Sequence, residues 1–320
     1  MIRWLVAGYG RVGACHVASI RRSANAKLVG IVALEDTITI NAPRFYALQE
    51  AIEVTQPDAV VIATPHDSHR ELALEAIEAG VSVLCEKPVG RNAAEAADIV
   101  AAAKTHGVWA GVVLNQRACP HPRWIRSLLD AGRFTCRTAG IQGALPALRG
   151  WNVEPQRSGG GVLRTVGIHY LDLLCWWFGA PESVAAALAG EPVDDVARVL
   201  ARFPGGVDAN MDLTAIGERS LGPVSIVLRS NGGYIRLSGH EVTDCAGVPA
   251  PPPSEPVPDA LAYGPGHLSI IQESTDGLLD GRGFSMPLEA HLPLLSLLDT
   301  IYARAVEQPV CTIRPAFKSA

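Results

Sequence analysis

The sequence predicts an α/β protein with two domains: a doubly wound parallel sheet, then an α+β domain with a large, mostly antiparallel open-faced sheet. A short apolar run, residues 1–7, leads directly into a glycine-rich segment and a helical pattern. Apolar runs then alternate with helical patterns as far as residue 114. Several long β-like segments follow residue 117. Alternation favours parallel strands, whereas a succession of strands favours an antiparallel sheet.

The first turn contains Gly8, Gly10 and Gly13 in the spacing G-x-G-x-x-G. Gly8 suits a tight turn, Gly10 lets the backbone approach a phosphate, and Gly13 allows close packing of helix on strand. The helix that follows offers free N–H groups at its N-terminus. This order predicts the binding of a dinucleotide pyrophosphate. A glycine turn that binds no nucleotide is the alternative.

The rest of the first half continues the alternation of strands and helices. Strands are expected at 28–33, 58–63, 81–85 and 108–114, and helices at 68–79 and 92–106. Ser68 is a plausible helix cap, and Gly80 and Gly107 are plausible stops. The crossover after the second strand is short, because residues 37–40 are not convincingly helical.

The second half is predicted to be richer in strands. Strands are expected near 135–145, 182–189, 194–203, 207–215 and 223–237, and helices near 121–131, 162–178, 265–280 and 287–307. A proline-rich stretch, residues 247–258, reads as a surface loop. We place the domain boundary between residues 118 and 119.

Composition excludes several classes of protein. The 320 residues carry a formal net charge of -5 and 48% hydrophobic residues, with no long basic run. We therefore expect no nucleic-acid partner and no membrane partner. The seven cysteines are scattered without a CxxC pair, which suits reduced thiols in a cytoplasmic protein. No metal site is expected, because His121, His240 and His291 lack metal-ligand spacing.

Three further motifs follow the glycine turn. They are Ala63–His69 (ATPHDSH), Glu86–Pro88 (EKP) and Gly159–Asp172 (GGGVLRTVGIHYLD). In this order the four motifs resemble the glucose–fructose oxidoreductase/inositol dehydrogenase/MocA (Gfo/Idh/MocA) family over nearly the whole chain. The resemblance implies an N-terminal dinucleotide-binding Rossmann domain, 1–118, and a C-terminal domain for substrate binding and oligomerisation, 119–320.

Shorter segments resemble one branch of that family, the nucleotide-sugar 3-dehydrogenases and 3-ketoreductases. These segments are Asn115–Arg117, Arg149–Trp151 and Tyr263–His267. The implied activity is hydride transfer between a nicotinamide cofactor and a carbinol (CH–OH) or keto carbon of a sugar or nucleotide-sugar. A lyase or epimerase that retains its cofactor, and a sugar-phosphate binding protein without redox activity, are the alternatives.

Lys87 and His169 are the expected catalytic residues. Lys87 follows a parallel strand at its carboxyl end, where a lysine can hold a substrate oxygen and share its proton. Histidine suits proton transfer near neutral pH, and the resemblance implies an acid–base or substrate-orienting role for His169. It also implies a cis Lys87–Pro88 peptide. The alternatives are an ordinary surface lysine and a buried structural histidine.

The remaining site residues fall into two sets. The cofactor set is Gly8, Tyr9, Gly10, Arg11, Val12, Gly13, Thr64, Pro65, His69, Glu86 and Lys87. The substrate set is Thr165, Arg117, Arg149, Trp151, Tyr263 and His267. Thr165 stands where many family members carry Asp, and a threonine hydroxyl is a very poor base at pH 7. On helical spacing, Thr165, His169 and Asp172 should share one helix face.

The coenzyme preference stays open between NAD and NADP. Rossmann sites often place an acidic residue after the second strand to bind the ribose 2′-OH, but here the position is near Ala33, followed by Leu34, Glu35 and Asp36. Weak cofactor binding is a third possibility. The open sheet of the second domain needs cover, and the resemblance implies a homodimer or homotetramer formed through it.

Overall fold

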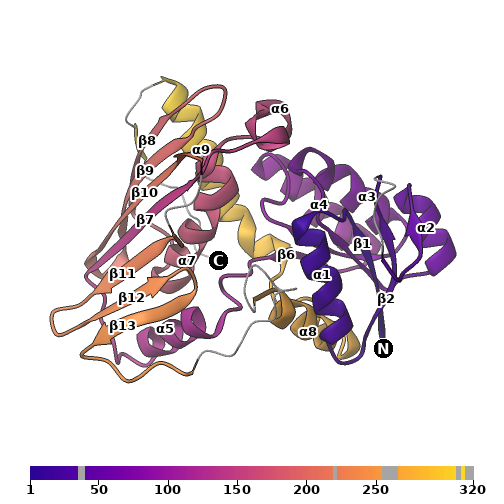
Figure 1. Cartoon of the computed structure of the whole chain (residues 1–320), viewed down its shortest axis with the longest axis horizontal. Helices are drawn as coiled ribbons and strands as arrows, with labels where there is room; N and C mark the ends of the chain where they lie inside the picture. The colour runs from indigo at the N-terminus through magenta and orange to yellow at the C-terminus, as the bar shows by residue number, and fades with distance from the viewer. Residues whose placement is uncertain (35–39, 219–221, 254–265, 308–310, 314–320) are drawn as a thin grey trace. The chain divides into compact units, whose positions relative to one another are not determined.

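The computed structural model describes residues 1–34, 40–218, 222–253, 266–307 and 311–313 (Figure 1). The chain divides into two compact units. Unit 1 is Met1–Ala118 with Pro256–Leu292, and unit 2 is Cys119–Glu255 with Pro293–Ala320. The sequence-based division at residue 118 assigned 256–292 to the second domain. The structure instead groups this segment with unit 1.

Trp4 shows why the segment belongs to unit 1. Its fully buried indole donates a hydrogen bond to the hydroxyl of Thr275, at 3.1 Å, on helix α8 (Gly266–Leu279). Ile270 and Ile271 of α8 join the apolar core around Trp4 and Ile20. The burial of these side chains fixes α8 against the first strand and the first helix, and no local pattern in the sequence specifies that contact.

Unit 1 is built on a parallel sheet, as predicted, but the sheet has six strands, and its short strand Arg44–Phe45 was not predicted from the sequence. Its strands are β1 (Ile2–Ala7), β2 (Ala26–Val32), β3 (Arg44–Phe45), β4 (Ala59–Ile62), β5 (Ser82–Glu86) and β6 (Ala110–Val113). Their spatial order is β3-β2-β1-β4-β5-β6, and each neighbouring pair is parallel. The strand order therefore reverses direction between β1 and β4, where an open sheet of this kind forms its binding crevice.

The helices of unit 1 follow the predicted alternation except that the helix at Leu48–Thr55 was not predicted. They are α1 (Arg11–Arg22), α2 (Leu48–Thr55), α3 (His69–Glu78), α4 (Ala93–His106) and α8, with short 3₁₀ turns at His66–Ser68 and Leu288–His291. Ser68 does not cap α3 as expected. Its hydroxyl instead contacts Thr64 Oγ1 and the carbonyl oxygen of Pro65, both at 2.8 Å. A 3₁₀ turn before α3 leaves Ser68 in a helical conformation that does not suit an N-cap.

Unit 2 is built on a mixed, mostly antiparallel sheet of eight strands. These are β7 (Thr138–Pro146), β8 (Ser183–Ala189), β9 (Val196–Phe203), β10 (Val207–Gly217), β11 (Ser225–Arg229), β12 (Tyr234–Ser238), β13 (Glu241–Ala246) and β14 (Cys311–Ile313). Their order is β13-β12-β11-β7-β10-β9-β8-β14. Only the β7–β10 pairing is parallel in this part of the described chain.

The described helices of unit 2 are α5 (Pro120–Asp130), α6 (Pro155–Ser158), α7 (Ile168–Phe178) and α9 (Leu292–Glu307), with a π-helical turn at Leu163–Gly167 and 3₁₀ turns at Gly150–Val153 and Pro204–Gly206. Helices α5, α7 and α9 lie on one face of this sheet, whereas α6 projects away from it (Figure 1). Burial alternates strictly along β9, so that Val199 and Ala201 are buried whereas Leu200 is exposed. None of the described helices is both long and apolar enough to span a bilayer.

Candidate functional site

The carboxyl edge of the parallel sheet collects most of the predicted cofactor residues. The segment Gly8–Gly13 follows β1, Thr64 and Pro65 lie just beyond β4, and Lys87 follows β5. These three strands are neighbours in the sheet. Their ends therefore deliver three separate stretches of sequence to one edge, next to the point where the strand order reverses.

The three glycines of the first turn are required for different reasons. Gly8 has a φ of +94°, and a Cβ there would lie 2.5 Å from the carbonyl oxygen of Ala63. A Cβ on Gly13 would lie 2.0 Å from the carbonyl oxygen of Gly8. A Cβ on Gly10 would meet nothing within 4 Å.

The open space at Gly10 lies at the N-terminus of α1. Gly10 is the N-cap of that helix, and because glycine has no side chain, it makes no side-chain capping hydrogen bond. The first turn of the helix also contains no acidic residue. Free N–H groups and the positive end of the helix dipole favour an anion at such a place. Arg11 is exposed beside it. These features fit the pyrophosphate of a dinucleotide.

His69 ties the end of β4 to the turn after β5. Its Nε2 lies 2.8 Å from the carbonyl oxygen of Thr64, and its Nδ1 lies 2.9 Å from that of Pro88. Burial lowers the pKa of His69 more than these bonds raise it, so a neutral ring donates through one nitrogen. In the structure His69 lies between the segments that carry Thr64 and Lys87, and its one N–H donates to one of the two carbonyl oxygens.

The adenosine side of the crevice differs from the usual arrangement. Ala33 is buried and Leu34 is strongly exposed. Glu35 and Asp36 lie outside the described residues. Between β2 and β3, the described residues 33–34 and 40–43 form no helix. The short crossover predicted at 37–40 falls mostly outside the described residues.

Lys87 lies at the end of β5 and is partly buried. The Lys87–Pro88 peptide is cis, as the resemblance implied. Desolvation lowers the pKa of Lys87 to about 8, although the carboxylate of Glu86 opposes the change. A lysine with this pKa exchanges its proton readily near neutral pH.

A buried cluster adjoins Lys87, and the sequence interpretation missed its central partner, His16. The Nε2 of His16, on α1, lies 2.7 Å from Glu86 Oε1, and the Nε2 of His267, on α8, lies 3.4 Å from the same oxygen. His267 was predicted to contact substrate, but it is only 3% exposed and faces Glu86. His16 lies three residues after Gly13 on the buried face of α1. This position in the sequence could have indicated that His16 lies near the site.

The spacing of these three side chains resembles that of a cation site, because one ligand atom from each lies within 4.8 Å of the others. The 2.7 Å separation between His16 and Glu86 is the length of a charge-assisted hydrogen bond. Ligand atoms around a tetrahedral zinc ion would stand farther apart, at roughly 3.3 Å, given bonds near 2.0 Å. We therefore describe a hydrogen-bonded cluster.

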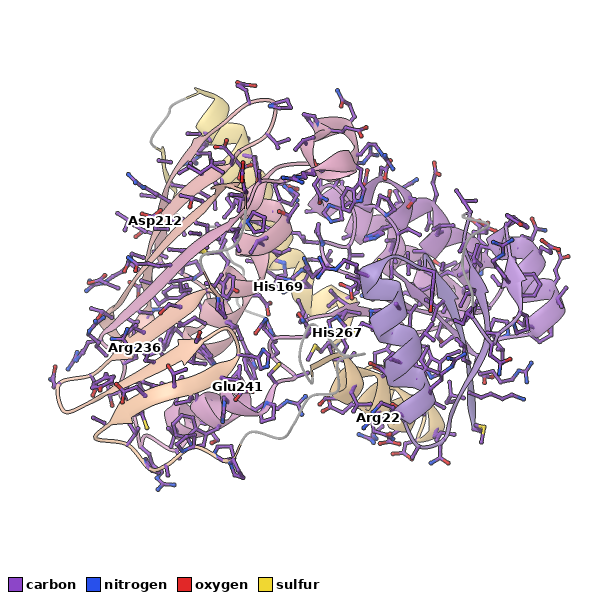
Figure 2. The ribbon with its side chains drawn as sticks, in the orientation of Figure 1. Arg22, His169, Asp212, Arg236, Glu241 and His267 are labelled. Carbon is purple, nitrogen blue, oxygen red and sulfur yellow. The ribbon has the colours of Figure 1, made fainter. Side chains whose placement is uncertain are left out.

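The second predicted catalytic residue, His169, lies on α7 in unit 2 and is partly exposed (Figure 2). Thr165 lies in the π-helical turn before α7, and its hydroxyl donates to the carbonyl oxygen of Gly161 at 2.8 Å. The expected common face of Thr165, His169 and Asp172 assumed an uninterrupted α-helix. A π turn changes that spacing, and the common face of the three residues stays a prediction.

The other predicted substrate residues are distributed over both units. Arg117 is partly buried in unit 1, and its charge contributes to lowering the pKa of His291 to about 3, after the larger effect of burial. Arg149 is exposed and Trp151 is half-buried, both at the 3₁₀ turn of unit 2. Tyr263 lies outside the described residues. Lys87 belongs to unit 1 and His169 to unit 2, and their pairing in one site remains a prediction.

Comparison with known protein families accounts for both units. Residues 2–114 match a model described as an oxidoreductase family with an NAD-binding Rossmann fold. Residues 125–232 match the C-terminal domain model of the same Gfo/Idh/MocA family. The two matches together span more than half of the chain.

Curated relatives include dehydrogenases and reductases. The chain is 34% identical over 178 residues to trans-1,2-dihydrobenzene-1,2-diol dehydrogenase of Mus musculus, covering 52% of each chain. It is 32% identical over 173 residues to 1,5-anhydro-D-fructose reductase of Ensifer adhaerens, covering 51% of this chain and 52% of the relative. An inositol 2-dehydrogenase of Rhizobium meliloti (strain 1021) is 25% identical over 280 residues, covering 75% and 82%. The chain spans about half the length of the first two relatives.

Solved structures share the fold. The WlbA dehydrogenase of Bordetella pertussis, crystallised with NADH and UDP-GlcNAcA, superimposes with a TM-score of 0.83 at 23% identity, covering 98% of this chain and 97% of the other. The aldose-aldose oxidoreductase of Caulobacter crescentus, crystallised with glycerol, gives a TM-score of 0.82 at 20% identity, covering 98% and 99%. At these identities the likeness establishes the fold.

Proposed function

We propose that this chain, which belongs to the Gfo/Idh/MocA family of oxidoreductases with an NAD-binding Rossmann fold, transfers a hydride between a nicotinamide cofactor and a carbinol or keto carbon of a cyclic sugar or polyol. The observation that carries the proposal is the carboxyl edge of β1, β4 and β5. That edge combines the open space at Gly10 with a lysine whose pKa is about 8. A phosphate-binding turn and a proton-exchanging side chain at one edge suit a nicotinamide-dependent reaction.

The residues around the glycine turn would hold the cofactor. Gly8, Gly10 and Gly13 would accept the pyrophosphate at the start of α1, with Tyr9, Arg11 and Val12 around it. Thr64 and Pro65 would border the nicotinamide side. When bound, the nicotinamide supplies the exchange of hydride, and the protein supplies orientation and electrostatics.

Lys87 would handle the proton that accompanies hydride transfer. When an alcohol is oxidised, the neutral amine accepts the hydroxyl proton as the C–H bond gives up its hydride. When a ketone is reduced, the ammonium group returns that proton to the forming alkoxide. His169 would share this work or orient the substrate hydroxyl, because an imidazole can donate or accept a proton.

The substrate class follows from what the relatives' names have in common. A dihydrodiol, an anhydro-sugar and an inositol each present a secondary oxygen function on a ring beside another oxygen-bearing carbon. We propose the same class here, and a nucleotide-sugar as its finer form, with Arg149 and Trp151 at the exposed 3₁₀ turn as candidates for the diphosphate and the base. A guanidinium suits a diphosphate geometrically, and an indole offers a stacking face.

The test has two stages. Binding of NADH and NADPH is first measured by nicotinamide fluorescence. Turnover is then followed with myo-inositol, 1,5-anhydro-D-fructose, and UDP-sugars beside their free sugars. We expect Lys87→Ala and His169→Ala each to reduce kcat by about a hundredfold or more, and His169→Ala to change cofactor affinity little.

Three results would contradict the proposal: no binding of either cofactor, full turnover in both variants, or turnover without net change in the nicotinamide. The last result would indicate a lyase or epimerase that retains its cofactor. A preference for a UDP-sugar over its free sugar, lost in Arg149→Ala, would support the finer substrate class.

A further inference from the structure

Glu86 is held on both sides by groups from different parts of the chain. Its Oε1 faces Nε2 of His16 at 2.7 Å and Nε2 of His267 at 3.4 Å. Its Oε2 accepts a hydrogen bond of 3.3 Å from the backbone N–H of Lys87. All three side chains of this cluster are at least nine-tenths buried, and they converge from α1, β5 and α8. The carboxylate therefore links two imidazoles to the residue that carries the proposed proton exchange.

The protonation of the cluster follows from its donors and acceptors. The hydrogen bonds and charges of His16 and His267 outweigh the burial that would raise the pKa of Glu86, and they hold it well below its usual range. An ionised carboxylate only accepts hydrogen bonds, so His16 must donate through Nε2. Burial lowers the pKa of His16. His16 is therefore a neutral donor near neutral pH.

His267 differs from His16 in its charge. Burial opposes its protonation, but hydrogen bonds to Cys15 and Glu86 and the negative charge of Glu86 together raise its pKa to about 9. The two rings pack edge to face, with centroids 5.1 Å apart. The carboxylate of Glu86 is thus shared between the neutral imidazole of His16 and the imidazolium of His267. The positive charge of His267 balances the negative charge of Glu86.

We propose that His267 is a positioning residue that acts through Glu86: its charge neutralises and fixes the carboxylate beside Lys87 and thereby sets how readily the lysine releases its proton. The inference rests on the proposed function, in which Lys87 exchanges the substrate proton. His16 completes the cluster by orienting the carboxylate without adding charge.

Other titratable groups of unit 1 face the same place. Cys15 lies beside His267 on α1, and Cys85 precedes Glu86 on β5. His69, from α3, interacts electrostatically with both Glu86 and Lys87. Burial lowers the pKa of His69 and raises that of Cys85 well above its usual range, so both are uncharged near neutral pH. The charge of Glu86 acts directly on Lys87, and the charges of Glu86 and Cys15 both act on His267.

The proposal predicts shifts of opposite sign in two variants. Glu86→Gln removes the negative charge that favours the ammonium form, so the pKa of Lys87 should fall by about one or more. His267→Gln keeps a donor but removes the positive charge, which leaves Glu86 unbalanced, so the pKa of Lys87 should rise. His16→Gln is the matched control, because it exchanges one neutral donor for another and should leave the pKa of Lys87 nearly unchanged.

The measurement is the rate at which Lys87 is acetylated in the full-length protein as a function of pH. The extent of acetylation is read by mass spectrometry of the peptides after digestion. Lys27, an exposed lysine of the same unit, serves as the internal reference amine. If the protein turns over a substrate, the pH profile of kcat should move in the same directions. If His267 had only a structural role, His267→Gln would lower stability. The pH profile of Lys87 acetylation would then not shift in opposite directions in Glu86→Gln and His267→Gln.

A second measurement uses the unaltered protein, in case a variant fails to fold. The imidazole signals of His267 are followed through a pH titration by NMR, with His267→Gln or His267→Asn used only for assignment. We expect His267 to remain protonated at pH 8. A titration at or below the ordinary histidine value of 6.5, or a Lys87 profile that moves in the same direction in Glu86→Gln and His267→Gln, would overturn the inference. Neither readout requires turnover, so failure of the proposed function is distinguishable from failure of this cluster.

Discussion

Two opposing influences act on the pKa of the Lys87 side chain. Its partial burial disfavours the ammonium form, and the neighbouring carboxylate of Glu86 favours it. The result is a lysine whose pKa is about 8, well placed for exchange in both directions near neutral pH. A fully exposed lysine would hold its proton, and a lysine buried without Glu86 would lose it.

The first prediction concerns the direction of the pH dependence. Oxidation needs the neutral amine, so kcat for oxidation should rise as the pH increases through about 8. Reduction needs the ammonium form, so kcat for reduction should fall over the same interval. Steady-state rates measured in both directions on one substrate pair test this. A common pH optimum in both directions, or an unchanged profile in Lys87→Met, would contradict the assignment.

At the scale of elements, two glycines of the β1–α1 turn have different roles: Gly13 is needed for packing, and Gly10 leaves space for a ligand. A Cβ at position 13 collides with the carbonyl oxygen of Gly8, whereas a Cβ at position 10 enters open space. We expect Gly13→Ala to lower the free energy of unfolding by about 1–3 kcal/mol, as overpacking does. Gly10→Ala should leave stability nearly unchanged and weaken NADH binding by roughly tenfold or more, since a methyl group occupies the space for phosphate.

Each of these glycine variants is the control for the other. Urea denaturation measures stability, and fluorescence titration measures cofactor affinity. Equal loss of stability in both variants would mean that the space at Gly10 is structural. Full NADH affinity in Gly10→Ala would mean that the pyrophosphate is bound elsewhere.

The π-helical turn before α7 is fastened to α9 within unit 2. Arg164, 2% exposed, pairs through Nη2 with Asp299 Oδ1 at 2.6 Å, and its guanidinium lies 5.0 Å from the ring centre of Tyr302. The Tyr302 hydroxyl in turn donates to Asp194 at 2.8 Å. This network anchors the segment that precedes His169.

We expect Asp299→Ala to destabilise the protein by about 1–3 kcal/mol, less than a fully buried pair because Asp299 is partly exposed. Arg164→Met combined with Asp299→Ala should recover most of that loss, because no buried charge then lacks a counter-ion. Unfolding in urea is the measurement. Asp280→Ala, which breaks an exposed pair with Arg282, is the control and should change little. No recovery in the double variant would show that the ion pair itself carries the stability.

The sequence predicted elements well where the signal is local. The glycine turn, the alternation of strands and helices and the strand near 194–203 each follow from patterns within a few residues. It failed where a distant contact decides the outcome. The partnership of His16 with Glu86 depends on which helix face meets β5, and the π turn at Thr165 interrupts a pattern that reads as one continuous helix.

At the scale of the whole molecule, the chain order does not match the order of the units. Residues 256–292 belong to unit 1, although strands of the unit 2 sheet both precede and follow them in the chain. This placement brings His267 to Glu86, and a linear division into an N-terminal and a C-terminal domain cannot anticipate it. We infer that the site chemistry of unit 1 is completed by a segment that the sequence alone assigned to substrate binding.

One face of the unit 2 sheet lies opposite its described helices. This face presents exposed apolar side chains and also ion pairs between neighbouring strands. Leu200 and Ile216 are 61% and 65% exposed. Arg202 pairs with Asp208 at 2.7 Å, and Arg198 with Asp212 at 3.2 Å, on the same exposed face of β9 and β10. Cross-strand ion pairs leave little net charge to repel a second copy, and the two apolar side chains gain from being covered.

We therefore expect a homodimer or homotetramer that associates through this face. Leu200→Glu combined with Ile216→Glu should shift the protein to monomers, because two buried carboxylates at an apolar contact are costly to desolvate. Sedimentation velocity over a range of concentrations measures the change. Val54→Glu, which replaces a similarly exposed apolar residue on α2 of unit 1, is the control and should leave the association state intact. A monomeric unaltered protein, or an oligomer that survives both charge substitutions, would show that the sheet face has another role, because an interface built on Leu200 and Ile216 cannot tolerate two added charges.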